Sequence, residues 1–171
     1  MTIIAARVFG DKTTMSCDSA LSENNGDLVT VGHKKIWKPN EHLIIGFCGD
    51  WECFSALRHR HVVEKREAAW FPPKHSVERW LYNNLAAGLE KRFSGEKEYS
   101  MLVGTRGGLY EVDSAGAVSA FSETYAALGS GVGFARGAMF AGALPVEAVR
   151  AAIFYTGNCR EPIFTESIKN T

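Results

Sequence analysis

The sequence predicts an α+β protein built as a four-layer αββα sandwich, in which two sheets pack together and a helix pair covers each outer face. Strand-like and helix-like segments are segregated along the chain, which argues against a doubly wound parallel sheet. Turn signals at Gly10-Asp11, Asn25-Gly26 and Gly107-Gly108 join successive strands, as in antiparallel meanders. With 171 residues and 46% hydrophobic content, residues 1–171 are expected to form one domain.

The first part of the chain is predicted to be a strand meander. Two β-like runs, 2–9 and 12–17, flank Gly10-Asp11, and a further strand over 28–31 follows Asn25-Gly26. Pro39-Asn40 is expected to break the chain before an apolar strand that starts at Leu43 and ends at a glycine.

Two helices should follow this meander. Apolar residues recur at helical spacing from Trp51, so a helix is expected over 51–65. After Pro72-Pro73, Ser76 is placed to cap a second helix that extends to Phe93. Its apolar residues fall on one face: Val77, Trp80, Leu81, Leu85, Leu89 and Phe93.

The second half repeats the order of strands followed by helices. Strands are expected over 99–105 and 109–112, and a turn at 113–116 leads into one more. The segment Gly129-Ser130-Gly131 precedes a small-residue helix that ends near Gly142, and Pro145 marks the start of a last helix.

Composition excludes several classes of function. The formal net charge is zero, which favours neither nucleic acid nor an anionic membrane surface as a partner, and no apolar run approaches the roughly 20 residues of a membrane helix. The four cysteines show no CxxC pair or metal-ligand spacing, and we interpret them as reduced thiols of a cytoplasmic protein. His59 and His61 diverge on a helix, and the glycines at 129–133 lack a βαβ frame. No metal and no cofactor is therefore expected.

Thr2 is the candidate nucleophile. If Met1 is removed, as a small second residue permits, Thr2 carries both a hydroxyl and a free α-amine. A threonine hydroxyl alone is a poor nucleophile, but an amine on the same residue can act as its base. An unperturbed α-amine has a pKa of roughly 8, close to neutral pH.

Four further segments occur at fixed distances from Thr2: Asp18 in Cys17-Asp18-Ser19, Lys35 in Lys34-Lys35-Ile36, Gly49 after an apolar strand, and Ser130 between two glycines. In this order and spacing the chain resembles the proteasome β-subunit family of N-terminal-nucleophile hydrolases. The resemblance extends over nearly the whole chain and implies the four-layer sandwich of that family.

The resemblance also implies a role for each residue. Thr2 would attack the scissile carbonyl, Lys35 would place a positive charge beside it, and Asp18 would hold the ammonium. The backbone N–H of Gly49 would stabilise the oxyanion, and Ser130 would hydrogen-bond around the amine. The subsite next to the scissile bond would be apolar and lined by Leu21, His33, Trp37, Phe47 and Trp51.

One feature departs from the family pattern. The family usually carries an aspartate near a Ser-Gly pair after the last helix, whereas the comparable stretch here offers only Asn158. An amide cannot supply the negative charge that would support the nucleophile.

The predicted function is that of a threonine endopeptidase subunit in a self-compartmentalised double ring, acting on peptides or unfolded proteins. The resemblance implies twelve or fourteen copies and an ATPase unfoldase ring as a partner. Two alternatives stay open: an amidase acting on small amides, and a catalytically silent scaffold subunit. Each residue alone also has a simpler interpretation, with Asp18 as a turn residue and Lys34-Lys35 as a solvated strand edge. Because adjacent strand residues face opposite sides, only one of the two lysines can face Asp18, and the distance to Gly49 favours Lys35.

Overall fold

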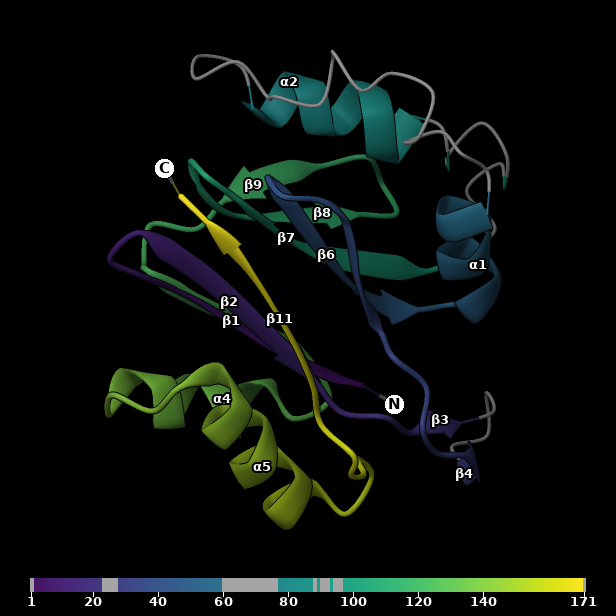
Figure 1. Ribbon diagram of the computed structural model, residues 1–171. Coiled ribbons are helices and arrows are strands. Elements are labelled where there is room, and N and C mark those ends of the chain that lie inside the picture. The colour runs from purple at the N-terminus through teal and green to yellow at the C-terminus, as the bar shows by residue number, and fades with distance from the viewer. Residues whose placement is uncertain are drawn as a thin grey trace.

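A computed structural model describes residues 2–22, 28–59, 77–87, 89, 93 and 97–170 of the chain. Figure 1 shows four layers: α2 at the top, then the sheet that contains β6 to β9, then the sheet of β1, β2 and β11, and finally α4 and α5. The predicted α+β sandwich is confirmed.

The first sheet joins strands from both ends of the chain, in the order β10-β1-β2-β11. Its strands are β1 (Ile3–Phe9), β2 (Lys12–Cys17), β10 (Tyr125–Gly129) and β11 (Phe164–Lys169), and all neighbours are antiparallel. The predicted tight turn between β1 and β2 is present, and Gly10 supplies its positive φ of 57°.

The second sheet is an antiparallel meander in the order β5-β6-β7-β8-β9. Its strands are β5 (Ile36–Asn40), β6 (Leu43–Gly49), β7 (Tyr99–Thr105), β8 (Gly108–Asp113) and β9 (Val118–Ala120). The two sheets bury one core between them, which includes Ile4, Met15, Ile44 and Leu102. Two short strands, β3 (Leu21–Ser22) and β4 (Leu28–Thr30), pair outside both sheets.

The helices bury apolar stripes against the outer faces of the sheets. The outer face of the second sheet is covered by α1 (Trp51–His59), α2 (Val77–Leu81) and the π-helical turn η2 (Tyr82–Ala86). These helices share a core with Phe47, Met101 and Val103. The first sheet packs against α4 (Val132–Phe140) and α5 (Pro145–Thr156) through Ile3, Ala5 and the alanines of both helices. Among the described helices, none combines the length and apolarity needed to span a membrane.

The expected break at Pro39-Asn40 is wrong, because both residues belong to β5 and the chain turns at the next two positions instead. Proline is tolerated here because β5 is an edge strand, and the register with β6 is irregular between Trp37 and Asn40. An edge position leaves one side of the strand without the ladder hydrogen bond that proline cannot donate.

The strands β10 and β11, which form both edges of the first sheet, were not predicted. The first is rich in alanine, a weak strand former, and the second carries few apolar residues. Polar pairs support β11 instead: Ser16 and Thr165 share a hydroxyl hydrogen bond of 2.8 Å, and Thr14 and Ser167 share one of 3.1 Å.

Several predicted features lie outside the described residues. These are the turn Asn25-Gly26, the last part of the helix expected over 51–65, the Pro72-Pro73 break and the capping residue Ser76. The second predicted helix is described from Val77 to Ala87, with Leu89 and Phe93 beyond it. Its expected apolar face does pack on the second sheet.

Candidate active site

Thr2 lies directly before β1 and is almost fully buried, with 8% of its surface exposed. Ser130 contacts its carbonyl oxygen twice, with the backbone N–H at 2.8 Å and the hydroxyl at 3.3 Å. Gly129 has a φ of 105°, and a side chain there would overlap the Thr2 carbonyl. The end of β10 therefore holds Thr2 through its backbone, whereas the sequence predicted that Ser130 would contact the amine.

Asp18 and Lys35 form a buried ion pair. The Lys35 Nζ donates to Asp18 Oδ1 at 2.7 Å, and the two side chains are 1% and 0% exposed. A buried ammonium persists only where a counter-charge and hydrogen bonds replace its water. The Asp18 carboxylate supplies that counter-charge for Lys35.

Asp18 also connects three separate segments. Its Oδ1 accepts the N–H of Ile3 at 2.9 Å, so one oxygen binds both the Lys35 ammonium and the amide directly after Thr2. Its Oδ2 accepts the N–H of Ala20 at 3.1 Å and that of Arg160 at 3.4 Å. The carboxylate thus fixes Lys35 relative to the start of β1.

The structure distinguishes the two adjacent lysines. Lys34 points the other way and pairs with Glu166 of β11, and its side chain is 41% exposed. Lys35 points into the protein toward Asp18. The alternation of neighbouring residues in an extended segment explains this difference.

Gly49 ends β6 in a conformation that only glycine adopts readily, with a φ of 118°. A Cβ at this position would overlap the carbonyl oxygen of Glu98 and would lie 2.7 Å from Tyr99 Cα. Its neighbour Cys48 lies within hydrogen-bonding reach of the Thr2 hydroxyl. The end of β6 and the nucleophile candidate are therefore adjacent.

Three thiols surround this region, and all of them are held in the neutral form. Burial raises the pKa of Cys17 to about 11, and burial is also the largest cause of the raised pKa of Cys48 and Cys159. The negative charge of Asp18 acts in the same direction at each thiol, although the Lys35 ammonium opposes it. Because the thiolate is the reactive form, Cys48 is a poor rival to Thr2 as a nucleophile.

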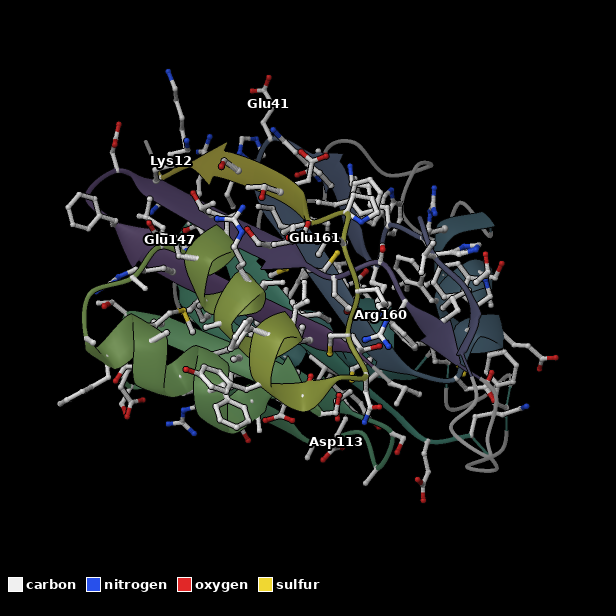
Figure 2. All side chains as sticks on the ribbon, turned by 90° about the horizontal axis from the view of Figure 1, so that it is seen from below. Lys12, Glu41, Asp113, Glu147, Arg160 and Glu161 are labelled. Atoms are coloured by element: carbon white, nitrogen blue, oxygen red, sulfur yellow. The ribbon has the colours of Figure 1, made fainter. Side chains whose placement is uncertain are left out.

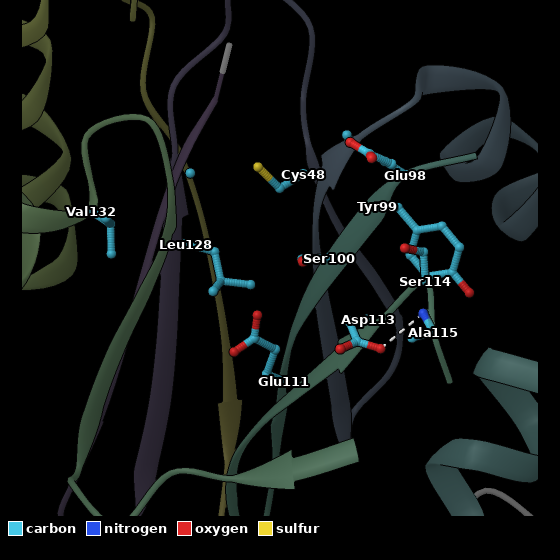
Figure 3. Close-up of a pocket in the computed structure, with 12 residues that line it drawn as sticks. Cys48, Glu98, Tyr99, Ser100, Glu111, Asp113, Ser114, Ala115, Leu128 and Val132 are labelled. Atoms are coloured by element: carbon cyan, nitrogen blue, oxygen red, sulfur yellow. Dashed lines mark hydrogen bonds between the residues drawn. The ribbon is translucent and has the colours of Figure 1, made fainter. Parts of the chain in front are cut away.

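A cavity of about 540 Å³ opens beside Gly49 and Gly129. Figure 3 shows Cys48 and Leu128 on one part of its wall, and Glu111 and Asp113 on another. Glu98 completes a set of three carboxylates, and no described lysine or arginine lines the cavity. One carboxylate oxygen of Asp113 accepts the backbone N–H groups of Ala115 and Ala117.

The five residues predicted to line an apolar subsite are not all equivalent. Phe47 is 3% exposed and stacks between Phe54 and Tyr99, so its ring belongs to the core. His33 and Trp51 meet edge to face at 5.4 Å between ring centroids. Trp37 packs against the same core, and Leu21 lies in the small β3–β4 pair. Apart from Phe47, these side chains are only partly buried.

The contact made by Cys159 was not predicted from the sequence. Its Sγ lies 3.7 Å from the Ser130 hydroxyl and the side chain is fully buried, whereas Asn158 is exposed. The residue that supports Ser130 after α5 is thus a neutral thiol. The signal that the sequence offers for this residue is its place directly after Asn158.

The described residues contain no group of three or more His, Cys, Asp or Glu side chains that could hold a metal ion. The groups that the structure brings together at this site are the hydroxyl of Thr2, its backbone, the Lys35–Asp18 pair and the backbone of Gly49.

Solved structures share this fold over nearly the whole chain. Eukaryotic HslV from Trypanosoma brucei aligns with a TM-score of 0.74 and 20% identity, covering 98% of this chain and 99% of that protein. Thiobacillus denitrificans BPH, a bacterial proteasome homologue, aligns with a TM-score of 0.75 and 17% identity over 99% of this chain and 98% of its own. The same protein in complex with epoxomicin aligns with a TM-score of 0.78 and 16% identity, covering 99% of each chain.

No protein-family model and no curated protein matches the chain at the level of sequence. At these identities the structural likeness shows the fold of HslV and BPH, which confirms the resemblance stated from the sequence.

Proposed function

We propose that the chain is a threonine peptidase subunit that cleaves peptides or unfolded proteins, with Thr2 as its nucleophile. The observation that carries the proposal is the buried Lys35–Asp18 pair, in which one carboxylate oxygen holds both the ammonium and the amide that follows Thr2. The fold shared with HslV and BPH supports the same reaction class.

The proposed mechanism needs removal of Met1, which frees the α-amine of Thr2. The Thr2 hydroxyl attacks the scissile carbonyl and passes its proton to the amine, directly or through one water. Collapse of the tetrahedral intermediate expels the leaving amine, which takes up that proton. Water then attacks the resulting ester, and the product acid leaves with Thr2 restored.

Lys35 and Gly49 would assist at charged stages of this reaction. The Lys35 ammonium favours the deprotonated hydroxyl electrostatically, and Asp18 keeps the ammonium in place. A backbone N–H at Gly49 would donate to the oxyanion, a contact of the kind worth about 3–4 kcal/mol in other acyl-transfer enzymes. The positive φ of Gly49 sets the direction of this part of the backbone.

The direct test is intact mass and peptide hydrolysis measured on the same purified protein. Loss of Met1 together with cleavage of internally quenched peptides supports the proposal. Cleavage of small amides alone would favour the amidase alternative, and a processed, assembled protein with no hydrolysis would favour the silent scaffold. The free cysteines fit the reducing cytoplasm, where we propose that the protein works.

We propose further that the subunits form a homo-oligomeric double ring, with an ATPase unfoldase ring as an associated partner. An exposed aromatic patch on α4 and α5 supports the assembly: Phe134, Phe154 and Tyr155 are 48%, 80% and 64% exposed. Phe134 stacks on Tyr155 at 5.1 Å, and Phe154 meets Tyr155 edge to face at 5.0 Å. Large exposed apolar patches of this kind typically mark interfaces, and a second copy across a two-fold axis could cover one patch with the other.

Replacing Phe154 and Tyr155 with serine should therefore reduce the assembly to smaller species without unfolding the subunit. Light scattering coupled to gel filtration measures the change. Phe9 is 75% exposed at the β1–β2 turn, outside the aromatic patch, so Phe9→Ser serves as the matched control and should leave the mass unchanged. A wild-type protein that stays monomeric at micromolar concentration would contradict the assembly itself.

Substrate preference should differ on the two sides of the scissile bond. The subsite near His33 and Trp51 should favour small or medium apolar substrate residues, since a charged substrate side chain there would be desolvated without a partner. The side that enters the cavity with Glu98, Glu111 and Asp113 should favour lysine or arginine over glutamate by about 2- to 5-fold, as expected for partly exposed charge pairs. A panel of internally quenched peptides, varied at one position at a time, measures both preferences. Best cleavage of peptides with acidic residues in the cavity would contradict the assignment.

A further inference from the structure

A second cavity, of about 530 Å³, lies at the end of the sandwich remote from Thr2. Thr2 precedes the start of β1, whereas this cavity lies where β1 turns into β2 and where β11 ends, and Figure 1 shows the two chain termini at opposite ends of the sheet. Its wall carries four positive side chains, which are Lys12, Lys38, Arg106 and Lys169. We name it the seam cavity, because both sheets contribute to it.

The cations come equally from the two sheets. Lys12 begins β2 and Lys169 ends β11 in the first sheet, while Lys38 lies in β5 and Arg106 follows β7 in the second. Lys12 and Lys169 are direct cross-strand partners. Like charges placed directly opposite each other destabilise a strand pair unless something neutralises them.

Lys38 brings a further charge to the same place. Its Nζ donates to the backbone carbonyl of Ser167 at 2.9 Å, so the ammonium lies on β11 two residues before Lys169. Burial and then the positive charge of Arg106 lower the pKa of nearby His42, although Glu41 opposes the effect. Arg106 therefore brings its positive charge close to His42 at this end of the sandwich.

Two carboxylates, of Asp11 and Glu41, also line the seam cavity, beside the four positive side chains. Within the described part of the chain, neither carboxylate forms an ion pair. Figure 2 shows Lys12 and Glu41 along one edge of the molecule, with their side chains directed away from the ribbon. The cavity wall therefore carries more positive than negative side chains.

We propose that the seam cavity binds a compact, multiply charged anion that carries phosphate or carboxylate groups. Lysine and arginine bind such groups through charge-assisted hydrogen bonds, and the volume falls in the range of small-molecule sites. None of the described lining residues is aromatic, so a nucleobase would find no stacking surface. The anion would bridge the two sheets, relieve the Lys12–Lys169 repulsion and stabilise the sandwich. This site is independent of the proposed peptidase activity.

Thermal unfolding of the full protein, with tripolyphosphate or citrate as the probe, tests the proposal. Sodium chloride at matched ionic strength separates binding from general screening. A saturable rise in Tm beyond the chloride control is expected, because a ligand that binds only the folded state stabilises it by mass action. A rise with tripolyphosphate alone assigns the site to phosphate, and a rise with both assigns it to oxyanions of either kind.

The Lys12→Gln, Lys169→Gln double variant should bind the effective anion roughly tenfold more weakly, by loss of two partly solvated charge contacts. Without any anion, the same variant should unfold at a higher temperature than the wild type, because the cross-strand repulsion is gone. The charge-matched control is Lys97→Gln, Arg150→Gln, which removes two positive charges engaged in surface ion pairs elsewhere and should leave binding unchanged.

The proposal is overturned if neither anion exceeds the chloride control. It is also overturned if the Lys12, Lys169 variant keeps wild-type affinity, or if the charge-matched control loses as much. Should the double variant fold poorly, Arg106→Gln alone must weaken binding of the same probe for the proposal to stand.

Discussion

Thr2→Ala should abolish peptide hydrolysis while the fold and the assembly stay unchanged. The substitution removes the proposed nucleophilic hydroxyl and a methyl group from a side chain that lies at the start of a strand, and the backbone contacts to Ser130 remain. Removal of the nucleophile from a catalytic unit costs about four orders of magnitude or more in kcat. Initial rates with an internally quenched peptide measure the loss, and light scattering measures the assembly.

Three comparisons make this test specific. Thr2→Ser keeps a hydroxyl and should retain measurable activity, while Cys48→Ala removes the nearest rival nucleophile and should leave most of it. The fraction of chains that have lost Met1, read by intact mass, should scale with the activity, since a blocked amine cannot act as the base. Undiminished cleavage by Thr2→Ala would refute the assignment.

The sequence predicted the parts of the fold that are encoded locally. The β1–β2 and β7–β8 hairpins were found because glycines mark their turns. The last helix was found because Pro145 opens it; Glu147 then accepts the Leu144 N–H at 2.7 Å, and Gly157 ends it with a φ of 66°. Such signals act within a few residues, so the sequence alone reveals them.

Features that depend on distant partners were missed or only partly predicted. In β10, Ala126 and Ala127 are weak strand formers that pair with β1, where Ala126 packs between the two sheets and Ala127 packs under α4 and α5. The contact between Cys159 and Ser130 spans 29 residues and has no local signature. Lys35 was singled out by its distance to Gly49, but its burial against Asp18 depends on how the segment before β5 faces the first sheet.

The buried pair leads to the largest expected effect on stability. Asp18→Asn keeps the shape of the side chain but leaves the Lys35 ammonium buried without its counter-charge. Breaking a buried pair from one side costs about 3–5 kcal/mol in free energy of unfolding. Lys35→Met should cost a similar amount, because it leaves the Asp18 carboxylate without its charged partner, whereas the double variant should cost clearly less than the sum. Urea unfolding at one fixed protein concentration measures all three.

Lys34 provides the matched control, since it is the adjacent residue and carries the same charge. Its pair with Glu166 is partly exposed, so Lys34→Met should change stability by less than about 1 kcal/mol. All three variants at Asp18 and Lys35 should also lose peptide hydrolysis, because the double variant restores packing without restoring the positive charge beside Thr2. Additive destabilisation in the double variant would show that the two side chains act independently. Full activity in Lys35→Met would remove the ammonium from the mechanism and leave the pair with a structural role only.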